Sequence, residues 1–106
     1  MAFQTRTRDF LEHHGLGHTP QTHALDLVSE VGEVAKALLE ASDYGQSSLT
    51  PGSALTEELG DAFYSLIALA ASLDVDLEAA LEGVLEKYEA RLAAQGHAGS
   101  AASRST

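Results

Sequence analysis

Apolar residues recur along most of this chain at spacings of three and four, and no stretch alternates with the period of two expected of a strand. Four helices are therefore predicted, over about residues 3–14, 20–43, 51–72 and 77–93. The chain is predicted to be all-α and to form one helical domain over residues 1–93. Four helices of this length favour a bundle-type arrangement.

Turn and cap residues place the ends of these helices. Gly15 follows the first apolar stretch and is predicted to stop that helix. Thr-Pro pairs at 19–20 and 50–51 have the form of an N-cap followed by proline at the first helical position. Asp76 is the predicted cap of the last helix.

The chain changes character from residue 94 onward. Residues 94–106 contain no large apolar side chain and consist mainly of alanine, serine and glycine. Such a composition cannot bury a core, so this C-terminal tail is predicted to be disordered.

The second and third helices carry more apolar surface than one packed face requires. Leu39, Phe63, Ile67 and Ala71 widen their apolar stripes. This surplus predicts a homo-oligomer, either a dimer or a tetramer. The alternative is a monomeric bundle in which these two helices are central.

One short motif occurs twice, 28 positions apart, at residues 27–35 and 55–63. Each copy places two acids three residues apart on one side of a helix: Glu30 with Glu33, and Glu58 with Asp61. If the two helices pack together, four carboxylates surround one point and repel one another unless a cation lies between them. A hard divalent cation such as Mg²⁺ prefers oxygen ligands of this kind, so the motif predicts a metal site.

Small residues accompany the paired acids. Gly32 and Gly60 lie between them, although a mid-helix glycine costs about 1 kcal/mol relative to alanine. Their presence suggests a backbone that another group approaches closely; the alternative is that both are tolerated imperfections. Ala37 and Ser65, farther along the same helix lines, would leave room for a ligand beside the acids.

Charge and composition exclude several classes of protein. The net charge is −10, from 16 acids against six lysines and arginines, which argues against duplex nucleic acid as a partner. An anionic substrate could bind only after metal ions neutralise the acids. The chain has no cysteine, which excludes disulfides and thiolate metal sites. It has no apolar run long enough to cross a membrane and no secretory signal, so we expect a cytoplasmic protein without membrane contact.

Other charged groups allow more than one interpretation. Three further acid pairs are predicted to be solvated: Asp9/Glu12, Glu40/Asp43 and Glu86/Glu89. No acid has a histidine three residues later, which argues against a carboxylate-bridged iron bundle. His13, His14 and His18 belong to a solvated loop end or hold adventitious metal. His23, seven residues before Glu30, could line the entrance of the metal site.

The few basic residues could hold phosphate oxygens. Lys36 follows Glu33 by three residues, and Lys87 and Arg91 lie four apart in the last helix. Ordinary surface pairing with nearby glutamates is the alternative.

The spacing of the acids resembles the defining pattern of the MazG-like nucleotide pyrophosphohydrolases, the all-α NTP pyrophosphatases. The resemblance covers about residues 20–92, and it rests on the two acid–Gly–acid motifs and, less specifically, on residues 76–91. It implies a MazG-like oligomeric helical fold that binds Mg²⁺, or Mn²⁺ in its place.

The same resemblance implies a reaction and a set of site residues. The reaction is hydrolysis of an NTP or dNTP to the monophosphate and pyrophosphate, a house-cleaning role against unwanted nucleotides. Glu30, Glu33, Glu58 and Asp61 would be the catalytic metal ligands, and Lys36, Lys87 and Arg91 the phosphate contacts. The chain has no tryptophan to stack on a base, so Tyr64, Phe63, Tyr44 or His23 would have to serve, and His23 and Tyr64 are the residues predicted for the base and sugar pocket. The competing hypothesis is a non-catalytic metal-binding helical oligomer that acts as a regulatory or interaction module.

Overall fold

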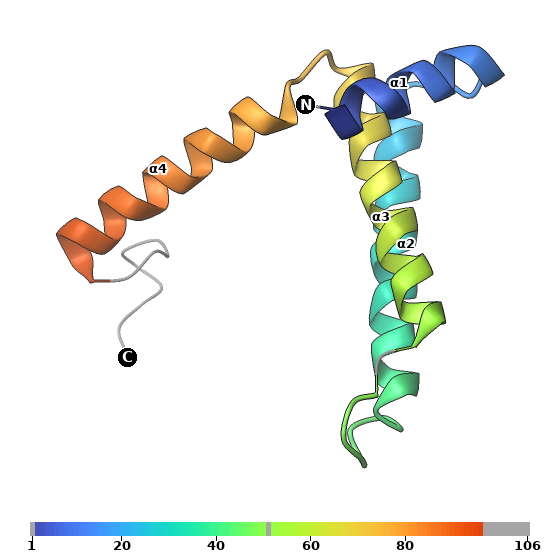
Figure 1. The fold of residues 1–106 in the computed structure, drawn as a ribbon, viewed down its shortest axis with the longest axis vertical. Helices are drawn as coiled ribbons and strands as arrows, with labels where there is room; N and C mark the ends of the chain where they lie inside the picture. The colour runs from blue at the N-terminus through green and yellow to red at the C-terminus, as the bar shows by residue number, and fades with distance from the viewer. Residues whose placement is uncertain (1, 51, 97–106) are drawn as a thin grey trace. The chain divides into compact units, whose positions relative to one another are not determined.

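The computed structural model describes residues 2–50 and 52–96, and over these residues it contains four helices and no strand. They are α1 (Ala2–His14), α2 (Pro20–Ala41), α3 (Ser53–Ser72) and α4 (Leu77–Gln95) (Figure 1). The prediction of an all-α chain is confirmed. The first three helices form one compact unit, residues 2–75, and α4 belongs to a second unit that is described by itself.

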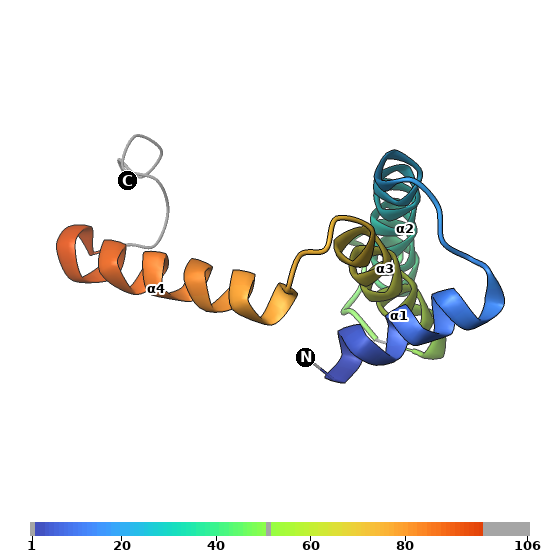
Figure 2. The same cartoon turned by 90° about the horizontal axis from the view of Figure 1, so that it is seen from above.

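Helices α2 and α3 run side by side in opposite directions as a long hairpin, as both views show (Figures 1 and 2). The start of α2 is fixed locally, because the Thr19 hydroxyl accepts a hydrogen bond of 3.2 Å from the backbone N–H of Thr22. Pro20 occupies the first turn, where its missing N–H costs nothing. The Thr-Pro cap predicted for this helix is confirmed.

Helix α1 packs on α3 through aromatic side chains. The rings of Phe3 and Phe63 meet edge to face with centroids 5.9 Å apart, and those of Phe10 and Tyr64 do so at 6.3 Å. Helix α1 ends at His14, and the next residue, Gly15, has a left-handed φ of +63° that glycine adopts without strain. The next N–H, that of Leu16, then donates to the carbonyl of Leu11 at 2.9 Å, so the predicted stop is confirmed.

The apolar core of this unit is small. Among the residues that the structure describes, five apolar side chains are buried, and they come mainly from α3: Leu11, Leu55, Ile67, Ala68 and Ala70. Ile67, which the sequence pattern assigned to surplus apolar surface, is the most buried large side chain. It is buried because α1 covers the side of α3 that α2 does not cover.

The hairpin connection differs from the prediction. Helix α2 ends at Ala41, two residues early, because Asp43 and Tyr44 adopt left-handed φ values of 50° and 55° that cannot continue a helix. Helix α3 begins at Ser53, and its N-cap is Gly52, which makes no side-chain cap hydrogen bond. The N-cap predicted at Thr50 is wrong, and Pro51 lies outside the described residues.

Helix α4 begins as predicted and ends later. The Asp76 carboxylate accepts hydrogen bonds from the N–H groups of Glu78 (3.0 Å) and Ala79 (3.2 Å), which confirms the cap. Residues 94 and 95 are helical, so the predicted tail boundary is two residues too early. Alanine and glutamine favour the helix, and it stops at Gly96 with φ 78°. Residues 97–106 of the predicted tail lie outside the described residues.

Each described helix falls short of the length or the hydrophobicity that a bilayer crossing demands.

Candidate functional site

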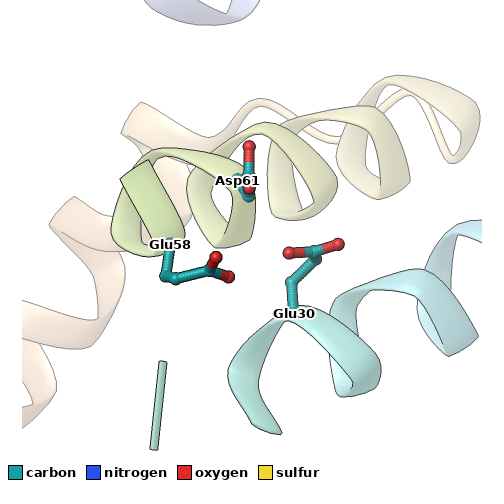
Figure 3. Close-up of side chains that lie close together, drawn as sticks. All are labelled: Glu30, Glu58 and Asp61. Atoms are coloured by element: carbon teal, nitrogen blue, oxygen red, sulfur yellow. The ribbon is translucent and has the colours of Figure 1, made fainter. Parts of the chain in front are cut away.

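Three of the four predicted acids converge between α2 and α3. Single carboxylate oxygens of Glu30, Glu58 and Asp61 all lie within 4.8 Å of one another. Glu58 and Asp61 are one turn apart on α3, and Glu30 extends toward them from α2 (Figure 3). The antiparallel hairpin brings the two motifs level with each other, so the repeated spacing in the sequence becomes one acidic cluster.

The cluster is electrostatically unfavourable as it stands. Partial desolvation of the half-buried Glu58 raises its pKa above the usual range, and the negative charges of Asp61, Glu33 and Glu30 raise it further. The raised pKa means that the charged form of Glu58 is destabilised by its surroundings. A cation among the three carboxylates would offset this destabilisation.

Glu33 lies outside this group of three. Its side chain is exposed on α2, although its charge still acts on Glu58. The structure therefore brings Glu30, Glu58 and Asp61 together as predicted and leaves Glu33 at the edge of the cluster.

The donor atoms fit a hard divalent cation. All are carboxylate oxygens, the ligand type of Mg²⁺ and Mn²⁺, and no sulfur or imidazole nitrogen takes part. Over residues 2–50 and 52–96, no other three acids or histidines come as close together. His13, His14 and His18, and the three further acid pairs, form no such group.

Tyr64 lines a cavity of about 600 Å³ between α1 and α3, here called the aromatic cavity. Its walls are Phe3, Arg6, Thr7, Phe10, Gly60, Phe63, Tyr64 and Ile67. Pockets of this size and apolar lining commonly hold small molecules.

His23 lies elsewhere, in a second cavity of about 310 Å³ beside the α1–α2 loop. It is buried, only 4% exposed, and its Nε2 accepts a hydrogen bond of 3.1 Å from the backbone N–H of His18. The two residues predicted to share a base and sugar pocket thus line separate cavities in this chain.

The predicted phosphate contacts are spread over two helices. Lys36 is exposed on α2. On α4, the Nζ of Lys87 lies 5.2 Å from the centre of the Tyr88 ring, and the Cζ of Arg91 lies 5.9 Å from it. These are cation–π distances, so Tyr88 orients both cations within their own helix.

The two motif glycines are open in this chain. A methyl group built on Gly32 or on Gly60 would meet no other heavy atom within 4 Å. The predicted close approach is therefore not made by the described residues of the first unit, 2–50 and 52–75. Of the two small residues along the same lines, Ser65 is buried and Ala37 is half-buried.

The sequence interpretation missed Arg6, which brings a positive charge to the aromatic cavity. Phe3, Thr7 and Phe10 share its wall. Their spacing along α1, four and then three, was the available signal for a helix face that packs against a partner helix.

The comparisons with known proteins give one match. The family model described as "MazG nucleotide pyrophosphohydrolase domain" matches residues 18–94. That span includes all four predicted acids and the whole α2–α3 hairpin. The search of curated proteins and the search of solved structures found no match.

Proposed function

Because this chain belongs to the MazG nucleotide pyrophosphohydrolase family, we propose that it is a Mg²⁺-dependent hydrolase of nucleoside triphosphates, NTP or dNTP. The observation that carries the proposal is the cluster of Glu30, Glu58 and Asp61 inside the matched span. The products are the monophosphate and pyrophosphate. The proposed role is house-cleaning of the nucleotide pool, in the cytoplasm, by a homo-oligomer.

The acids of the cluster are the proposed metal ligands, with Glu33 as the fourth. A divalent cation bound there would neutralise the carboxylates and polarise the phosphate oxygens of the substrate. It would also offset the charge of −10 that otherwise repels a triphosphate. Mn²⁺ has the same ligand preference and is expected to substitute for Mg²⁺.

The chain's own residues then position water and accept its proton. The water oxygen bonds to the α-phosphorus, and the bond from that phosphorus to the oxygen bridging to the β-phosphorus breaks. Pyrophosphate leaves with the bridging oxygen. A glutamate of the motif within hydrogen-bond range takes the proton of the water. Glu33 is suited to this role because it is exposed at the edge of the cluster.

The roles proposed for the remaining site residues rest on the family resemblance and on the cavities that these residues line. Lys36, Lys87 and Arg91 are proposed to contact phosphate oxygens. Tyr64 and His23 are proposed for the base and sugar; Tyr64, in the larger cavity beside Phe10 and Arg6, has the surroundings of a ring-stacking residue.

Hydrolysis of a panel of NTPs and dNTPs with Mg²⁺ in H₂¹⁸O tests this function. The expected result is pyrophosphate release, with ¹⁸O in the monophosphate only. Label in free orthophosphate would indicate attack at the γ-phosphorus instead.

The second candidate is a non-catalytic metal-binding module that regulates or binds another protein. It is favoured by the presence of the acidic cluster in a chain whose two predicted base-pocket residues line separate cavities. Metal binding without turnover of any nucleotide, with either Mg²⁺ or Mn²⁺, would support this second candidate.

A further inference from the structure

Four of the five histidines of this chain gather where α1 is joined to α2. His13 and His14 end α1, His18 lies in the connecting loop, and His23 lies near the start of α2. The ring centroids are 4.7 Å apart for His13 and His14 and 5.7 Å apart for His18 and His23. Histidine is the side chain whose ordinary charge change falls between about pH 5 and pH 8, so this histidine cluster responds to acid.

His23 differs from the rest of the histidine cluster in its burial. The other three side chains are exposed, whereas His23 is buried and lines the second cavity. A buried polar ring needs a hydrogen-bond partner. Its Nε2 has one in the backbone N–H of His18, 3.1 Å away.

This hydrogen bond attaches the loop to α2. Over residues 2–50 and 52–96, it is the one hydrogen bond that joins residues 16–18 to α2. The N–H of Leu16 donates instead to the carbonyl of Leu11 in α1, at 2.9 Å. Thr19 is already engaged as the cap of α2. The attachment of residues 16–18 to α2 therefore depends on a single acceptor atom, the Nε2 of His23.

The charged groups that face His23 come from α1 and from the loop. Arg8 and Glu12 of α1 line the same cavity and carry opposite charges, so their effects on the ring oppose each other. His18 lines it from the loop, and two protonated rings at this separation repel. The residues of α3 that line the cavity are uncharged: Ala68, Ala71 and Ser72.

Protonation of His23 destroys the acceptor. The lone pair of Nε2 that accepts the N–H of His18 is the one that takes up the proton, and the protonated ring is a donor at both nitrogens. Two N–H groups would then point at each other inside a buried site. Each of them reaches water or another acceptor only if the loop moves away from α2.

We propose that His23 is a pH-sensitive switch of the α1–α2 loop. The neutral ring holds residues 16–18 on α2, and the protonated ring releases them. The switch uses neither the acidic cluster nor a nucleotide, so it stands or falls independently of hydrolysis. The release is local, because the Thr19 cap of α2 does not use this hydrogen bond.

Hydrogen exchange of the wild-type chain is the first test. The protection factor of the His18 amide is measured at about pH 7.5 and about pH 5, relative to an unstructured peptide at the same pH. It is expected to fall about fivefold or more at the lower pH, because the amide loses its acceptor. The amide of Ile67, a buried residue of α3, is the internal reference and should stay protected. Equal protection of His18 at both pH values would overturn the proposal.

Glutamine variants identify the histidine that is responsible. His23→Gln takes up no proton, so the protection that remains at residue 18 should no longer change with pH. His14→Gln removes an exposed ring of the same cluster and should keep the wild-type response. His18→Gln keeps the backbone N–H and should also respond. A response that survives His23→Gln, or that disappears in His14→Gln, would contradict the assignment.

A spin label tests the loop even if His23→Gln folds poorly. The chain has no cysteine, so Gly17→Cys introduces a unique thiol, at a position where an added Cβ meets nothing within 4 Å. A nitroxide attached there should become more mobile between about pH 7.5 and about pH 5 and recover when the pH is restored. Gln46→Cys places the same label in the exposed α2–α3 connection and should show no such change. A label at residue 17 that is equally mobile at both pH values would show that the loop does not open.

Discussion

At the scale of single residues, Glu58 experiences the electrostatic repulsion between the carboxylates of the acidic cluster. Its neighbours Asp61, Glu33 and Glu30 all disfavour its negative charge. Glu58→Gln should therefore raise the melting temperature in EDTA at neutral pH, because the amide removes the repulsion. Thermal denaturation followed by circular dichroism measures this. A lower melting temperature in EDTA would mean that Glu58 stabilises the metal-free fold.

The sign of the pH dependence follows from the raised pKa of Glu58. The folded chain binds this proton more tightly than the unfolded chain does, so the group's contribution to stability grows as pH falls through the raised pKa. Protonated Glu58 and glutamine are nearly isosteric and both neutral. The difference in melting temperature between wild type and Glu58→Gln in EDTA should therefore shrink toward zero as the pH is lowered. A difference that stays constant would contradict electrostatic repulsion as its cause.

Glu33 and Asp61 are predicted to matter for turnover and not for folding. Both are exposed, so Glu33→Ala or Asp61→Ala should keep the helical circular dichroism and lose detectable pyrophosphate release. Glu40→Ala, an exposed acid on the same helix as Glu33, is the control and should keep full activity. An active Glu33→Ala protein would remove Glu33 from the proposed ligands.

The sequence predicts most of this site because helix spacing is fixed by the backbone. Two acids three residues apart share a helix side, and two such motifs meet when the helices pack antiparallel. The position of Glu33 was not predictable in the same way. A step of three residues falls short of a full turn, so the rotation of each helix about its own axis decides whether both acids of a pair reach the cluster. On α3 both do, and on α2 only Glu30 does. Arg6 was missed because only the packing of α1 on α3 brings it to the aromatic cavity.

At the scale of helices, the caps decide where each element starts. Asp76→Ala removes the acceptor of two backbone hydrogen bonds at the start of α4 and should cost about 1 kcal/mol of helix stability. Hydrogen exchange at the amides of Glu78 and Ala79 should then speed up roughly fivefold. Asp76→Asn is the control, since asparagine is an equally good cap. Unchanged exchange in the alanine variant would show that the cap bonds are dispensable.

The cap residues in the sequence predicted the helix starts correctly where no tertiary contact involves the cap residue. The prediction was wrong at Thr50, which makes a contact across the α2–α3 hairpin. The caps at Gly15, Thr19 and Asp76 each involve hydrogen bonds between residues no more than five positions apart, which a local sequence pattern can display. Thr50 has the same sequence signal as Thr19. Its N–H instead donates to the carbonyl of Ala41, 3.4 Å away across the hairpin, so α3 starts later. That contact belongs to the tertiary fold and leaves no local pattern.

At the scale of the whole molecule, metal binding should be visible as stability. A cation that binds the folded cluster and not the unfolded chain raises the melting temperature by mass action. Millimolar Mg²⁺ or Mn²⁺ should therefore shift the wild-type melting curve upward, and the shift should be reduced in Glu58→Gln. Matched ionic strength with sodium chloride controls for screening. A melting curve that neither ion moves would exclude the three-carboxylate site.

The buried imidazole of His23 has a spectroscopic consequence. Its Nε2 accepts the N–H of His18, so the ring proton must sit on Nδ1, and the tautomer is fixed by the loop. The NMR signals of the two ring nitrogens of His23 therefore report whether the hydrogen bond from His18, in the loop of residues 15–19, is formed. The other four histidines of the chain provide the comparison within the same spectrum. The protein thus contains its own reporter of loop closure, and any variant can be followed with it without an added label.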